Sequence, residues 1–286
     1  MLPSLVCYAD ILGYQQLTRR EIDAGRGEEF LRRVHKALTR AHGAVRASTR
    51  DVSGALAYDV NVLTDNIVVG YPIELSGFGE RELIDVLQIF AQLQMHLAAA
   101  GFLMRGGIAL GDHYMSSDVV FGPALLDAVA KDAHGGSPRL ALTDAARDLV
   151  DKHSVFYGGH GHAPATRYVC RDADGVYFVS YLSTAVMLFE ESGPDLAFIE
   201  QHRETVTDGL ELYAGDTGVR SKYEWAARYH NFFCLDFADR HQQSSTPDAD
   251  PAYGAACEEA QGLRELLINL EAFAVHPESL TSGRSA

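Results

Sequence analysis

Long apolar runs are missing from this 286-residue sequence: none reaches the roughly 18 residues that a membrane-spanning helix needs. Cysteine is scarce as well, and its four copies do not stand at the spacing of a zinc site or a redox motif. They are Cys7, Cys170, Cys234 and Cys257. No secretory signal is visible at the N-terminus, where a strand pattern begins almost at once. These absences predict a soluble, cytoplasmic protein with reduced thiols and no membrane partner.

Basic residues are also in short supply. Lys and Arg total 24 against 39 Asp and Glu, so the formal net charge is −15, and the basic side chains are scattered along the chain. A nucleic-acid-binding surface requires a stripe of positive charge, so we expect no nucleic-acid partner. A nucleotide substrate is still compatible, because a bound divalent metal can carry the positive charge. The 47% of hydrophobic residues is enough for a full-sized core.

The hydrophobic pattern of the first half alternates between strand and helix periods. Strands are predicted at 3–12, 54–63, 66–73, 103–111, 119–121 and 139–142, and helices at 26–48, at 79–100 and from 122 onward. The order β-α-β-β-α-β, followed by a helix and a strand, is the ferredoxin-like arrangement of the α+β class. Two helices should cover one face of an antiparallel sheet. The other face then needs a cover from the C-terminal part or from a second subunit.

The second half is less regular. We expect a loop at 158–165, strands at 166–170 and 176–182, helices at 195–213 and 218–238, a polar connector at 241–252, and a last amphipathic helix whose apolar stripe runs from 263 to 273. Residues 276–286 should be loosely held. The sequence therefore predicts a mixed domain at 1–185 and a mostly helical extension at 186–286 that packs on it.

Two of the strand patterns carry an aspartate where an apolar residue would continue the pattern. Asp10 lies at the end of the first strand, and Asp65 at the junction of the second and third. A carboxylate on a buried strand costs free energy unless a cation neutralises it. The first and third strands are neighbours in this fold. The two carboxylates and the Ile11 carbonyl would therefore form an oxygen-rich site for two Mg²⁺ or Mn²⁺ ions, which suits in-line attack on a phosphate.

Two other interpretations of these aspartates stay open on the residues alone. Aspartate is common in turns, so Asp10 and Asp65 are each also compatible with a turn at a strand end. Polymerase palms and diguanylate cyclases also use two carboxylates. A relationship to polymerase palms or diguanylate cyclases is disfavoured, because the sequence has neither a Gly-Gly-Asp/Glu-Glu-Phe hairpin nor a basic surface for a template.

Four segments resemble the motifs of class III nucleotidyl cyclases, in the same order. They are Tyr8–Tyr14, Leu63–Asn66, Arg105–Gly111 and Val120–Leu125. The resemblance implies that Asp10, Asp65 and the Ile11 carbonyl bind two Mn²⁺ or Mg²⁺ ions, and that Gly13 and Tyr14 contact the substrate. In this family the ribose 3′-oxygen attacks the α-phosphate and pyrophosphate leaves. Family members are homodimers with the sites between subunits, so we expect a homodimer.

The chain departs from the purine cyclases of that family at two base-reading positions and two transition-state positions. The residues there are Asn61, Val119, Leu126 and Ala130. Leu126 and Ala130 replace an asparagine and an arginine, and neither side chain can take over their role. Lys131 and Arg105 are the candidates for the missing catalytic positive charge.

Three further segments resemble the pyrimidine cyclases of bacterial antiphage defence, the Pycsar systems. They are Pro138–Leu140, Gly175–Leu182 and Lys222–Asn231. This resemblance implies an enzyme that converts UTP to cyclic UMP, or alternatively CTP to cyclic CMP, for a separate effector protein. Tyr58 and Asn61 would then contact the pyrimidine. A non-catalytic nucleotide-binding module is a further alternative, favoured by Leu126 and Ala130.

Overall fold

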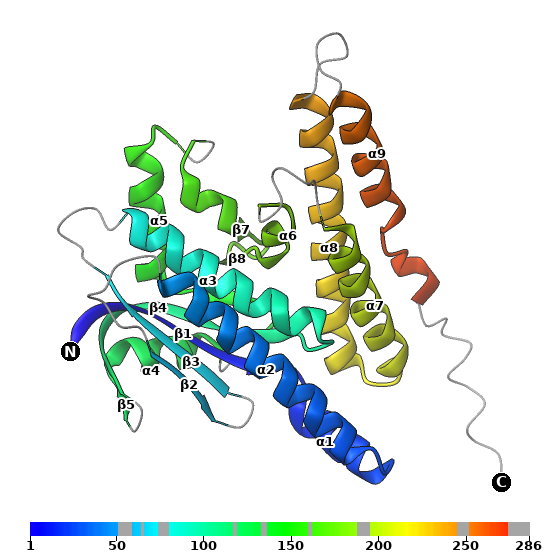
Figure 1. Ribbon diagram of the computed structural model, residues 1–286, viewed down its shortest axis with the longest axis horizontal. Coiled ribbons are helices and arrows are strands. Elements are labelled where there is room, and N and C mark those ends of the chain that lie inside the picture. The colour runs from blue at the N-terminus through cyan, green and yellow to red at the C-terminus, as the bar shows by residue number, and fades with distance from the viewer. Residues whose placement is uncertain are drawn as a thin grey trace. The chain divides into compact units, whose positions relative to one another are not determined.

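The protein is described from a computed structural model, which covers residues 1–50, 59–63, 66–73, 80–116, 119–132, 136–159, 162–187, 195–244 and 252–273. The chain divides into two compact units, Met1–Glu190 and Glu191–Ala286. The first unit contains the sheet and its helices, and the second contains three further helices (Figure 1).

An eight-stranded sheet organises the first unit. Its strands are β1 (Leu2–Ile11), β2 (Asp59–Leu63), β3 (Asn66–Pro72), β4 (Met104–Met115), β5 (Val120–Phe121), β6 (Leu140–Leu142), β7 (Val169–Arg171) and β8 (Tyr177–Val179). They follow the order β2-β3-β1-β4-β6-β8-β7, and β5 pairs with β4. The β4–β6 pair is parallel and the other pairs are antiparallel. The order β2-β3-β1-β4, with helices after β1 and β3, confirms the predicted ferredoxin-like α+β fold.

Helices cover both faces of this sheet. They are α1 (Tyr14–Asp23), α2 (Gly27–Arg50), α3 (Glu80–Ala99), α4 (Pro123–Asp132), α5 (Asp144–Phe156) and α6 (Thr184–Met187). Figure 1 shows α2 and α3 side by side across one face, while α4 lies against β1 and β4 on the other. Side chains alternate between the faces of a strand. Along β1, Cys7 and Ala9 are therefore buried towards α2 and α3, while Val6 joins the apolar cluster under α4.

Two helices of the first unit were not predicted. Residues 14–25 and 143–157 received no element from the sequence, yet they contain α1 and α5. In α1 just two side chains are buried, those of Leu17 and Glu21, so the helix carries almost no apolar stripe. Burial of Glu21 is compensated by ion pairs with Arg20 and Arg26 at 2.9 and 2.8 Å. A helix with so few buried apolar side chains is hard to predict from hydrophobic periodicity.

The strand predicted at 176–182 is too long, because β8 ends at Val179. Residues 181–183 form a 3₁₀ turn instead, and α6 follows. The hydroxyls of Ser180 and Ser183 lie 2.7 Å apart, and the Thr184 hydroxyl donates to the Tyr181 carbonyl at 2.6 Å. Such local side-chain hydrogen bonds compete with a sheet ladder. Similarly, residues 164–168 form a 3₁₀ turn that begins at Pro164, so β7 starts only at residue 169.

The second unit consists of α7 (Leu196–Leu212), α8 (Thr217–Ser244) and α9 (Ala252–Glu265), with a short turn at Leu270–Phe273. Helix α8 continues into the predicted connector, and the predicted final helix ends early. Ile268 explains the early end: its N–H donates to Asn231 and its carbonyl accepts from the same amide, each at 2.8 Å. Among the described helices, none is both long and apolar enough to cross a bilayer.

A pair of fully buried histidines joins α7 to α8. The rings of His202 and His230 are stacked with their centroids 5.2 Å apart and their Nδ1 atoms 3.0 Å apart. Nε2 of His230 is 3.0 Å from the Leu266 carbonyl, which can only accept, so this nitrogen carries the proton. His202 Nδ1–H then donates to His230 Nδ1. Burial lowers the pKa of His230 to about 4 and holds the pKa of His202 well below its usual range.

We predict that the second unit loses stability in mild acid. The unfolded chain binds protons at these histidines below pH ~6.5, whereas the folded pair stays neutral, so stability falls as the pH drops from ~6.5 towards 4. The slope should approach about 1.4 kcal/mol per pH unit for each histidine. Urea unfolding followed by the fluorescence of Trp225, the single tryptophan, measures it.

The matched variants are His202→Gln with His230→Gln, and His35→Gln as the control, because His35 is exposed on α2. The double variant should flatten the pH dependence, and the control should keep it. An unchanged slope in the double variant would show that the pair is not its source.

Candidate functional site

Asp10 lies near the end of β1 in a row of residues that crosses four strands. Its Cα partners are Asn66 on β3 and Arg105 on β4, and Asn66 in turn pairs with Leu63 on β2. Arg105 binds the Asp10 carboxylate with Nη2 at 2.9 Å and Nε at 3.3 Å from Oδ2. The hydroxyl of Tyr8 donates to Oδ1 of Asn66 at 2.8 Å. The row therefore holds a carboxylate, an amide and a guanidinium side by side.

The ion pair explains how β1 tolerates a carboxylate. The side chains of Asp10 and Arg105 are 17% and 24% exposed, so both charges are largely removed from water. A partly buried charge is stable when a partner neutralises it. The sequence predicted metal ions at this carboxylate and named Arg105 as a candidate catalytic cation; the structure pairs Arg105 with Asp10. Arg105 is thus placed at the carboxylate itself, on the face of the sheet that α4 covers.

The chain turns from β1 into α1 directly after Asp10. Gly13 is the residue before α1 and has φ = 70°, a left-handed conformation that favours glycine. The first turn of α1 contains no acidic residue and receives no capping bond from the Gly13 position. The positive end of the helix dipole therefore lies close to Asp10 and Ile11 in the chain. Tyr14 packs on Phe30, with ring centroids 6.2 Å apart.

Helix α4 approaches β4 closely because β4 carries glycines where they meet. A Cβ atom on Gly107 would lie 2.2 Å from the carbonyl oxygen of Ala128, a distance that real Cβ atoms do not show. The same atom would lie 2.8 Å from Cβ of Lys131. Gly107 is the Cα partner of Tyr8. The base of Lys131 is therefore fixed over the β1–β4 pair, on the same face as Arg105.

The structure describes some of the remaining predicted site residues and not others. Asp65 and Tyr58 lie outside the described residues. Asn61 belongs to β2, where its Cα partner is Val68. Ile11 is the last residue of β1. Among the residues that the structure describes, no group of three or more His, Cys, Asp or Glu is arranged to hold a metal.

The described part of the expected metal site does have suitable donors. The Asp10 carboxylate and the Ile11 carbonyl are oxygen ligands, as Mg²⁺ and Mn²⁺ prefer. Asn66, the residue that follows Asp65 in the chain, is directly opposite Asp10. The oxygen donors present are therefore of the kind that fits a hard divalent cation.

The positions expected to lack transition-state side chains are on α4 and near it. Leu126 is 70% exposed and points its apolar side chain outward. Ala130 lines a pocket, one residue before Lys131. Val119, just before β5, is exposed. None of these three side chains can donate a hydrogen bond to a substrate.

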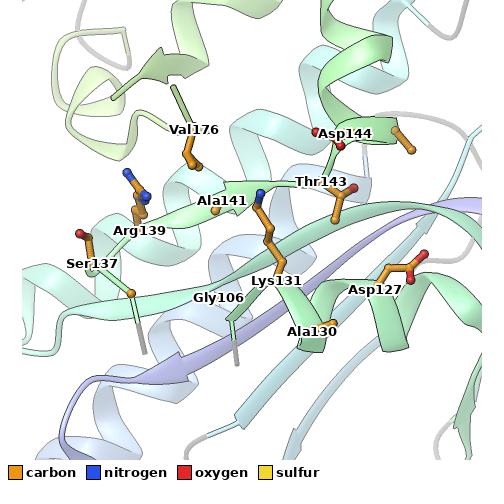
Figure 2. A pocket seen from close by; sticks show the side chains of 12 residues that line it. Gly106, Asp127, Ala130, Lys131, Ser137, Arg139, Ala141, Thr143, Asp144 and Val176 are labelled. Atoms are coloured by element: carbon orange, nitrogen blue, oxygen red, sulfur yellow. The ribbon is translucent and has the colours of Figure 1, made fainter. Parts of the chain in front are cut away.

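A pocket of about 630 Å³ lies between the end of α4, β6 and the start of α5, and we call it the α4–α5 pocket (Figure 2). Its lining includes Ala130, Lys131, Ser137, Arg139, Thr143 and Asp144. Arg139 forms ion pairs with Asp172 and with Asp174, the latter at 2.5 Å. The Arg139 guanidinium holds the pKa of Asp174 below its usual range. Sequence reasoning found Lys131 but not the pocket, because most of its wall is the chain between α4 and α5, where no motif marks a binding site.

Comparison with known proteins gives distant structural similarity alone. No family model and no curated protein matches the chain. Among solved structures, the adenylyl cyclase CyaB from P. aeruginosa is similar at 10% identity and a TM-score of 0.41, covering 62% of this chain and 93% of that one. A bacterial light-regulated adenylyl cyclase is similar at 15% identity and a TM-score of 0.35, covering 71% and 98%. At this distance, no residue role can be transferred.

We predict that Gly107→Ala displaces α4. The added Cβ meets the Ala128 backbone, which cannot rotate away, so the variant should be destabilised by about 1–3 kcal/mol. The urea midpoint from circular dichroism measures the loss. Gly43→Ala is the control, because Gly43 lies in α2 with no atom within 4 Å of an added Cβ. It should be neutral or stabilising by up to about 1 kcal/mol. Equal midpoints for the Gly107 variant and the natural protein would contradict the close packing.

Proposed function

We propose that this protein is a metal-dependent pyrimidine nucleotide cyclase that converts UTP to 3′,5′-cyclic UMP and pyrophosphate. The observation that carries the proposal is the Asp10 carboxylate, held at the end of β1 between Asn66 and Arg105 in a ferredoxin-like sheet. The order of the four cyclase-like motifs supports it. By the same resemblance, the product acts as a second messenger read by a separate effector in antiphage defence.

Asp10, Asp65 and the Ile11 carbonyl are the proposed ligands of two Mn²⁺ or Mg²⁺ ions. When bound, these ions would activate the ribose 3′-hydroxyl and stabilise the charge on the departing phosphates. Arg105 neutralises and orients the Asp10 carboxylate through its two hydrogen bonds. The positive end of α1 favours phosphate oxygens beside Gly13, and Tyr14 would line this end of the site.

Lys131 is the proposed replacement for the transition-state cation. It follows Ala130, which has taken the position of the family arginine, and the packing of α4 on Gly107 fixes its base over the β1–β4 pair. An ammonium at this point would stabilise the negative charge that develops on the leaving pyrophosphate.

Asn61 and Tyr58 are the proposed contacts of the base. An asparagine side chain both donates and accepts hydrogen bonds, so Asn61 can pair with O4 of uracil or with the amino group of cytosine. We favour UTP as substrate, and CTP is the second candidate. A non-catalytic nucleotide-binding module is the other candidate, and the apolar Leu126 and Ala130 are the observation that favours it.

Product analysis tests the activity. We expect cyclic UMP as the main product when the protein is incubated with each of the four nucleoside triphosphates and Mn²⁺, with mass spectrometry as the readout. Asp10→Asn should lower the rate by on the order of 100-fold or more, because it removes a metal ligand. Asp112→Asn is the control: it is exposed on β4 opposite Pro3, far along the strand from Arg105.

Each other outcome has a defined meaning. Cyclic AMP or cyclic GMP as the main product would refute the pyrimidine assignment. Binding of UTP without release of pyrophosphate would refute the cyclase activity and support the non-catalytic nucleotide-binding module.

The proposed partner is a second copy of the chain. The β4–β5 hairpin and α4 expose neighbouring apolar side chains, namely Tyr114, Phe121, Leu126 and Val129. Tyr114 and Phe121 are Cα partners in the hairpin. Exposed apolar surface of this kind typically marks a protein interface. It borders the α4 residues of the proposed site, so a subunit bound here would complete that site.

We predict that Phe121→Glu converts a dimer to a monomer and reduces cyclase activity, because it places a charge in an apolar interface. Sedimentation velocity gives the mass. Val155→Glu on α5 is the matched control, since Val155 is also exposed and apolar but lies outside the hairpin and α4. A dimer that survives the Phe121 substitution, or a natural protein that is monomeric and active, would rule out this surface.

A further inference from the structure

We propose that the α4–α5 pocket is a binding site for a phosphate-class oxyanion, held by the ammonium of Lys131 and the hydroxyl of Thr143. None of the cyclase-like motifs includes Thr143 or the start of α5. The identity of the ligand, as the phosphate tail of the nucleotide or as free pyrophosphate, rests on the proposed function. The binding itself does not.

Lys131 supplies the positive charge. It lies in the last turn of α4, and Figure 2 shows its side chain extending from α4 towards β6. In the described part of the chain, its ammonium group makes no hydrogen bond or ion pair. The close packing of α4 on Gly107 fixes the position from which this side chain extends. A lysine without an ion pair is an effective phosphate ligand.

Thr143 supplies a hydrogen-bond donor whose position is also fixed. Its N–H donates to the Ile108 carbonyl at 2.8 Å, and its own carbonyl accepts from Arg147 N–H at 2.9 Å. Its Oγ1 is buried, makes no bond to the first turn of α5, and has no hydrogen-bond partner among the residues described. A buried hydroxyl usually finds a partner. An oxyanion in the pocket would provide that partner.

Among the described residues that line the pocket, Lys131 is the cation that forms no ion pair, and its charge also acts on Asp174. Arg139 is already neutralised by Asp172 and Asp174. Asp144 is exposed and binds Arg147 at 3.0 Å, which compensates its charge. The 13-residue helix α5 adds its positive end beside Thr143. The pocket volume of about 630 Å³ is ample for a diphosphate or triphosphate group.

Asp127 would repel the oxyanion, so it provides a test of whether the bound ligand is negatively charged. It lines the same pocket from α4, four residues before Lys131, and its carboxylate would repel a phosphate. Removing that charge should therefore tighten binding, whereas removing Lys131 should weaken it. A pocket that binds a neutral or cationic ligand would show the opposite response or none.

Titration calorimetry of the full-length protein with sodium pyrophosphate, at low salt and with EDTA, tests the site without metal or turnover. We expect Lys131→Met to weaken binding about 10-fold or more, Thr143→Val several-fold, and Asp127→Asn to tighten it. Lys131→Arg should retain binding. Lys152→Met on α5 is the matched control, because Lys152 is exposed outside the pocket, and it should bind as the natural protein does.

A parallel titration with UTP distinguishes the two sources of the phosphate. Equal weakening of UTP and pyrophosphate by Lys131→Met identifies the pocket as the site of the nucleotide tail, and weakening of pyrophosphate alone identifies a site for the free anion. No pyrophosphate binding by the natural protein, or unchanged binding by Lys131→Met with an unchanged unfolding midpoint, would overturn the proposal. Absence of cyclase activity with pyrophosphate binding intact would refute the proposed function alone.

Discussion

The close contact between α4 and β4 is the constraint on which the first unit depends. Because Gly107 has no side chain, the Ala128 carbonyl can approach the strand to a distance that a Cβ would forbid. This contact covers the sheet face opposite α2 and α3. It also fixes where Lys131 begins and where the apolar side of α4 remains exposed. The glycine thus positions both the α4–α5 pocket and the surface proposed for a second subunit.

Any electrostatic attraction of an anionic ligand to this protein has to be local, because the overall charge is negative. With a net charge of −15, the chain as a whole repels a nucleoside triphosphate. Attraction must come from a few groups at short range, where screening by salt is weakest. Arg105 is committed to Asp10, and Arg139 to Asp172 and Asp174. Around the proposed site, in the part of the chain that the structure describes, the N-terminal ends of α1 and α5 and Lys131 are further positive elements, to which bound divalent metal would add.

The sequence predicted those elements whose side chains show a regular period. The strand order, the position of Asp10 and the two helices over the sheet followed from periodicity and from the spacing of the aspartates. Helix α1 was not predictable in this way, because its buried side chains are Leu17 and the ion-paired Glu21 rather than an apolar stripe. The partner of Asp10 required the register of β1 with β4, since Arg105 lies 95 residues away in sequence. Pairing of strands, and not local propensity, creates this part of the site.

The apolar residues Leu126 and Ala130 on α4 do not by themselves decide between an enzyme and a binding module. Leu126 and Ala130 remove two side chains from a helix, but the backbone of that helix is held against Gly107 whatever its outer residues are. A cation one residue later on the helix is displaced by about 100° around its axis. Lys131 therefore points towards β6 and α5 instead of along the direction of Ala130. Under the proposed function, the phosphates of the substrate would lie on this side of α4, towards β6 and the start of α5.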